Sequence, residues 1–163
     1  PGELPTMTDW ADHTTTIFPE VRLKKYIEMR GADGGPWRRL CALPAYWVGL
    51  LYDTPALDAA WDLVKDWTAE EVVGMRNAVP AQGLNAPFRD GTLLDIARRS
   101  LEISRCGLKN RNRLDFWGED ECHFLATLEQ SADSGLTPAE NKLAAYHARW
   151  DENVDRAFEE YAY

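Results

Sequence analysis

The chain has 163 residues, of which 45% are hydrophobic, and carries a formal net charge of −9 at pH 7. This length suits a single domain with one hydrophobic core, so we expect residues 1–163 to form one domain. The acidic balance argues against a nucleic-acid partner, and no apolar run reaches the ~18 residues that would indicate a membrane span.

Two strands are the first elements predicted along the chain. Residues 12–17 contain three threonines and are expected to form a short strand that turns at Phe18–Pro19. Residues 21–30 alternate with period two, which predicts a second strand with one buried face. Its apolar face would hold Val21, Leu23, Ile27 and Met29. Its polar face would hold Arg22, Lys24, Tyr26, Glu28 and Arg30.

Helices are predicted for the rest of the chain. Thr54–Pro55 is typical of a helix start, and Thr68 and Thr137 each begin the spacing of a capping box. Gly107 is expected to stop one helix and Gly135 another. The expected helices begin near residues 36, 54, 68, 90, 119 and 137 and end by about residue 160. The predicted fold class is therefore α+β, with a short antiparallel β ribbon (strands about 12–30) followed by a mainly helical bundle (about 36–160).

Basic residues are concentrated between Glu20 and Arg39. This segment contains six basic and three acidic residues, whereas the rest of the chain is acidic. A local basic island of this kind favours a small anionic ligand over a polyanion. The alternative is a solvated strand face with scattered ion pairs.

The three cysteines, Cys41, Cys106 and Cys122, lack the CxxC spacing of metal and redox motifs. Their number and spacing argue against a disulfide framework and against a zinc site. A reducing compartment is the default for such a chain, so we expect a cytoplasmic protein.

The segment from Asp9 to Asp53, DWADHTTTIFPEVRLKKYIEMRGADGGPWRRLCALPAYWVGLLYD, closely resembles the C-terminal part of glutamate–cysteine ligases of the plant and proteobacterial type. The resemblance continues more thinly through residues 66–71, 83–91 and 136–143, and fades in residues 109–124. It implies a glutamine synthetase-like carboxylate–amine ligase fold. Members of this family are much longer, so the resemblance also implies an N-terminal segment that holds much of the active site. A plant source would make a plastid location the alternative to the cytoplasm.

The resemblance implies an ATP- and Mg²⁺-dependent reaction that joins the side-chain carboxylate of glutamate to the amine of cysteine. In the family, the glutamate of an E-x-R element acts as a metal ligand and the arginine as a phosphate contact. Glu28 and Arg30 match these two residues, so the resemblance implies the same roles for them. Arg22 is a further candidate catalytic residue, and Lys24 a candidate contact to the nucleotide. The competing interpretation is an ion pair of Glu28 with Arg30 or Lys25, with Arg22 and Lys24 only balancing charge.

Two other functions stay open from the sequence. The chain could belong to a non-catalytic helical interaction module derived from the same fold, or to a carboxylate–amine ligase with a different amine substrate. The expected partners of the ligase are glutamate, cysteine, ATP and the rest of the same enzyme, with a homo-oligomer left open and no nucleic acid or membrane involved.

Overall fold

The computed structural model describes residues 2–16, 18–23 and 25–161. It divides into two compact units, Pro1–Gly34 and Gly35–Tyr163, which we call the ribbon unit and the helical unit. The expected single-domain organisation stays a prediction. Among the described residues, no helix has the length and apolar composition that a membrane crossing requires.

The ribbon unit begins with helix α1, Met7–Thr15, where the sequence predicted a strand over residues 12–17. That prediction was wrong for residues 12–16, because a capping box starts a helix upstream, and Ile17 lies outside the described residues. The carboxylate of Asp9 accepts hydrogen bonds from the backbone and hydroxyl of Thr6, and the Thr6 hydroxyl accepts one from the backbone of Asp9. The three threonine hydroxyls bond to carbonyls one turn earlier instead of lining a strand.

An antiparallel hairpin follows, formed by β1, Val21–Leu23, and β2, Ile27–Met29. The single strand predicted over residues 21–30 is therefore wrong, because the chain reverses between Leu23 and Ile27. The division into two faces still holds, since Arg22 pairs with Glu28 and Val21 with Met29, so even-numbered residues stay together. The expected burial does not hold: Val21, Leu23 and Ile27 are 50%, 81% and 61% exposed.

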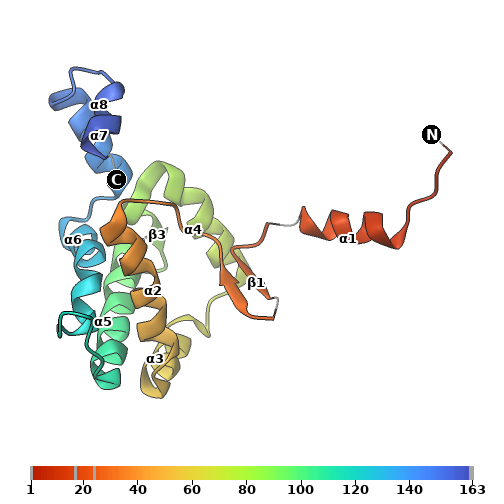
Figure 1. Cartoon of the computed structure of the whole chain (residues 1–163), viewed down its shortest axis with the longest axis horizontal. Coiled ribbons are helices and arrows are strands. Elements are labelled where there is room, and N and C mark those ends of the chain that lie inside the picture. The colour runs from red at the N-terminus through yellow and green to blue at the C-terminus, as the bar shows by residue number, and fades with distance from the viewer. Residues whose placement is uncertain (1, 17, 24, 162–163) are drawn as a thin grey trace. The chain divides into compact units, whose positions relative to one another are not determined.

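The fold class is confirmed as α+β, with an antiparallel ribbon near the N-terminus followed by helices. Most of the helical unit consists of longer helices joined by short turns (Figure 1). Its elements are α2 Trp37–Leu51, α3 Thr54–Val64, α4 Ala69–Gln82, η1 Gly83–Asn85, β3 Pro87–Phe88, β4 Gly91–Thr92, α5 Leu93–Arg111, η2 Glu121–Leu125, α6 Ala126–Ser134, α7 Pro138–Ala148 and α8 Asp155–Glu160.

The core of the helical unit lies where α2 packs along α5 (Figure 1). Leu50, Ala56 and Ile103 form one buried cluster, in which α3 also takes part. A second cluster joins Leu108 of α5 to Cys122 and Leu125 of η2. Burial of this apolar surface is what holds the helices together.

Several helix boundaries differ from the prediction. Helix α5 continues through Gly107 to Arg111 and ends at Asn112 in the left-handed conformation. Asp53, not Thr54, caps α3 by accepting a hydrogen bond from the backbone of Ala56. The last predicted helix divides into α7 and α8, with residues 151 and 152 at positive φ between them. The capping boxes at Thr68 and Thr137 and the stop at Gly135 are confirmed.

Candidate functional site

The polar face of the β1–β2 hairpin carries the candidate site. Arg22 and Glu28 are directly paired residues on adjacent antiparallel strands, which places their side chains on the same face. Nε and Nη2 of Arg22 each lie 2.8 Å from Oε2 of Glu28. Both side chains are about one-third exposed or less, so the ion pair is partly screened from water.

Arg30 extends this cluster one residue beyond β2. Its backbone N–H donates to the carbonyl of Glu20 at 2.8 Å, which continues the hairpin register. The guanidinium lies over the ring of Phe18, 5.1 Å from its centroid, and Nε is 4.0 Å from Oε2 of Glu28. One terminal nitrogen, Nη1, is buried and has no hydrogen-bond partner among the described residues.

The charges and donors of this cluster suit an anionic ligand. The Glu28 carboxylate lies within 4.0 Å of two guanidinium groups, those of Arg22 and Arg30. A buried N–H without a partner costs free energy unless a ligand or water accepts its hydrogen bond. Within the described part of the chain, Nη1 of Arg30 is such a donor. A phosphate oxygen fits this donor, and the Glu28 carboxylate offers the oxygen chemistry that Mg²⁺ prefers.

The remaining predicted residues have different outcomes. Lys24, the candidate nucleotide contact, lies outside the described residues. His13, which lies within the expected first strand, is an exposed residue of α1 whose ring lies 6.0 Å from that of Trp10. The structure therefore brings together Arg22, Glu28 and Arg30. The competing interpretation, an ion pair of Glu28, is also seen. Among the described residues, however, the closest cation to Glu28 is Arg22, not Arg30 or Lys25.

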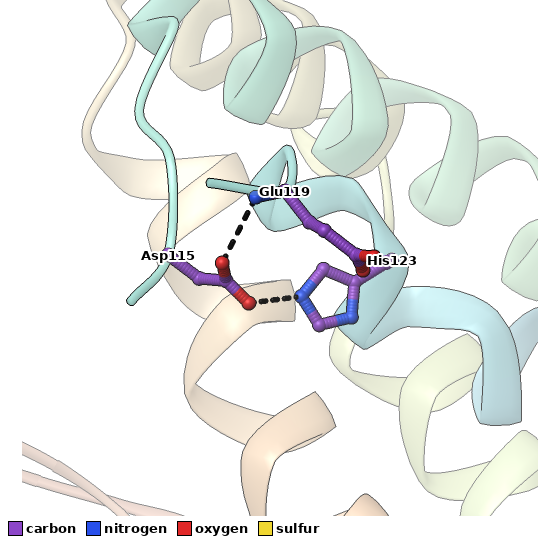
Figure 2. Close-up of side chains that lie close together, drawn as sticks. All are labelled: Asp115, Glu119 and His123. Atoms are coloured by element: carbon purple, nitrogen blue, oxygen red, sulfur yellow. Dashed lines mark hydrogen bonds and ion pairs between the residues drawn. The ribbon is translucent and has the colours of Figure 1, made fainter. Parts of the chain in front are cut away.

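A second cluster, which was not predicted from the sequence, is formed by Asp115, Glu119 and His123 (Figure 2). These residues lie in the turn between α5 and η2 and in η2 itself, within the segment where the resemblance to the ligases fades. One ligand atom from each lies within 4.8 Å of the others, which is close enough for a shared metal ion. Their regular spacing of four residues was the only signal in the sequence.

Hydrogen bonds account for the Asp115 cluster without a metal. Oδ1 of Asp115 accepts from the backbone N–H groups of Trp117 and Glu119, and Oδ2 lies 2.9 Å from Nε2 of His123. The hydrogen bond from Glu119 is the main cause that lowers the pKa of Asp115, so the carboxylate is ionised and Nε2 of His123 donates to it. These hydrogen bonds hold the turn between α5 and η2 in place.

Comparison with known proteins identifies the family. Residues 2–160 match the model of glutamate–cysteine ligase family 2. The chain is 53% identical over all 163 residues to chloroplastic glutamate–cysteine ligases of Medicago truncatula and Arabidopsis thaliana, and to glutamate–cysteine ligase A of Oryza sativa subsp. indica. It spans 30–32% of the length of these relatives. The match extends across nearly the whole chain, so the chain belongs to glutamate–cysteine ligase family 2.

Proposed function

We propose that this chain forms part of the ATP and Mg²⁺ site of a ligase that joins the side-chain carboxylate of glutamate to the amine of cysteine. The observation that carries this proposal is the Arg22–Glu28–Arg30 cluster, in which Nη1 of Arg30 is buried without a hydrogen-bond partner among the described residues. Family membership supports it, because the relatives are named glutamate–cysteine ligases. The product is γ-glutamylcysteine, the first intermediate of glutathione biosynthesis.

The reaction requires a site for negative charge. A carboxylate does not condense with an amine in water unless it is activated, and phosphoryl transfer from ATP converts it to an acyl phosphate with release of ADP. The amine nitrogen then attacks the acyl carbon, phosphate leaves, and the amine loses a proton. Negative charge on the transferring phosphoryl group must be neutralised by cations fixed in advance.

Arg30 and Glu28 have distinct roles in this proposal. Arg30 donates from Nη1 to a phosphate oxygen, and the Phe18 ring beneath its guanidinium limits the positions that the side chain can take. Glu28 would hold Mg²⁺ through a carboxylate oxygen, and the ion would supply positive charge to neutralise the nucleotide phosphates. A single carboxylate is too few ligands for Mg²⁺, so groups outside this hairpin would have to complete the site.

The apolar face of the hairpin indicates that another segment covers the ribbon unit. Leu23 and Ile27 are more than 60% exposed on a two-stranded ribbon, and an isolated ribbon of this kind is marginally stable in water. Because the chain spans only about a third of its relatives, we propose that another segment of the same ligase extends the ribbon into a larger sheet and covers this face. The relatives are named chloroplastic, which favours a plastid location over the expected cytoplasmic one.

The test is ADP release by the complete ligase that carries this segment, with Mg²⁺ and ATP present and with glutamate or cysteine omitted in turn. Full turnover is expected only with both amino acids, and the isolated 163-residue chain is expected to show none. Full turnover with an amine other than cysteine would favour the related ligase with a different amine substrate. Absence of both turnover and ATP binding in the complete protein would favour the non-catalytic module.

A further inference from the structure

The two arginines of the candidate site differ in what they contact. Arg22 directs Nε and Nη2 at the same oxygen of Glu28, each at 2.8 Å. Nε of Arg30 lies 4.0 Å from that oxygen, beyond hydrogen-bonding distance, and Nη1 of Arg30 is buried without a partner among the described residues. Two nitrogens of Arg22 therefore bind the Glu28 carboxylate, whereas Nη1 of Arg30 is available to donate a hydrogen bond to a ligand.

The hairpin fixes this arrangement through its backbone. Residues 22 and 28 are paired across the two strands, so their Cβ atoms lie about 5 Å apart whatever the side chains are. A glutamate has three side-chain torsions, and the planar fork of an arginine limits them more tightly than a lysine ammonium does. Without Arg22, the nearest described cation for Glu28 is Arg30, and a pair between them would occupy the proposed phosphate contact.

We propose that Arg22 is a positioning residue, which orients the Glu28 carboxylate and keeps it apart from Arg30, and not a group that contacts substrate. This inference rests on the proposed function, because it assigns Glu28 to the metal and Arg30 to the phosphate. It replaces the catalytic role that the sequence suggested for Arg22. Partners that hold a metal ligand in this way typically change metal affinity roughly 10–100-fold when they are removed, which is the range expected here.

The experiment measures Mn²⁺ binding to the complete ligase by electron paramagnetic resonance, with a non-hydrolysable ATP analogue present. The variants are Arg22→Gln, Arg22→Lys, Glu28→Asp and the double variant R22Q/E28D, each checked for folding by circular dichroism. Arg99→Gln is the matched control, because Arg99 forms an exposed ion pair with Glu102 on α5. Steady-state kinetics on the same proteins separate kcat from the KM for glutamate and for ATP.

Positioning predicts that R22Q raises the Mn²⁺ dissociation constant roughly tenfold or more, that R22K has a smaller effect, and that R99Q has none. It also predicts that R22Q adds little in the E28D background, because Arg22 acts through Glu28. Equal effects of R22Q in the two backgrounds, or a raised KM with unchanged Mn²⁺ binding, would overturn the inference in favour of direct substrate contact. Unchanged Mn²⁺ binding in E28D would instead refute the metal role of Glu28, and with it the proposed function.

Discussion

Gly49 of α2 and Gly107 of α5 lie against each other where the two helices pack. A Cβ atom on Gly107 would overlap the carbonyl of Gly49, and one on Gly49 would overlap the backbone of Ser104. The Ser104 hydroxyl, which is fully buried, donates to the carbonyl of Tyr46 at 2.9 Å across the same contact. The close approach of the two backbones thus depends on the absence of side chains at both positions.

Gly107→Ala is therefore expected to destabilise the chain by about 1–3 kcal/mol, because the overlap is with backbone that moves only if the helices separate. Urea denaturation followed by tryptophan fluorescence measures this. Gly74→Ala is the matched control: Gly74 lies inside α4, and a Cβ atom added there would meet nothing within 4 Å, so alanine should stabilise by roughly 0.5–1 kcal/mol. Equal effects of the two substitutions would contradict the packing role.

A second prediction concerns Glu71, which caps α4 and binds Arg89. Arg89 donates to both carboxylate oxygens, at 2.7 and 2.8 Å, and this is the main cause that lowers the pKa of Glu71 from 4.5 to about 2. Because the folded-state pKa is the lower one, this group contributes stability above about pH 4.5 and loses it as the pH falls towards 2.

Arg89→Gln should therefore lower the unfolding midpoint at about pH 6 more than at about pH 2, so the wild-type and variant curves converge at low pH. Thermal unfolding across this pH range measures the difference. Arg99→Gln, which breaks an exposed ion pair within α5, serves as the control and should give a small, nearly constant offset. Parallel wild-type and R89Q curves would show that Arg89 does not act through the charge of Glu71.

A third prediction follows from the turn held by Asp115. Its carboxylate accepts hydrogen bonds from the backbone N–H groups of Trp117 and Glu119. Asp115→Ala should speed hydrogen exchange at these two amides roughly tenfold, since each loses its acceptor. Glu119→Gln changes the charge of the cluster and keeps both hydrogen bonds, so exchange there should not change. Faster exchange at both amides in the glutamine variant would indicate a metal or charge effect instead.

The sequence predicted the helical unit better than the ribbon unit, for physical reasons. Capping boxes such as Thr68–Glu71 are local, so their spacing alone identifies a helix start. Gly107 was misread because a glycine at a helix–helix contact and one at a helix end have the same sequence signal, and only the partner Gly49 distinguishes them.

In the ribbon unit, the alternation of residues 21–30 correctly separated two faces but could not reveal the reversal between Leu23 and Ile27. Because Leu23 pairs with Ile27, odd-numbered residues pair with odd-numbered ones and even-numbered with even-numbered ones. A hairpin with this register and one long strand therefore give the same alternating pattern. It was therefore predictable that Arg22, Glu28 and Arg30 lie on one face. The hydrogen bond from Arg22 to Glu28 was not predictable.

The most direct test of the central claim is ADP release by the complete ligase carrying Glu28→Gln or Arg30→Gln, compared with the matched controls Glu102→Gln and Arg99→Gln on α5. Each ribbon substitution is expected to lower kcat/KM for ATP by roughly 100-fold or more, while the control enzymes keep wild-type turnover. Wild-type turnover in either ribbon variant would contradict the assignment of this hairpin to the nucleotide and metal site.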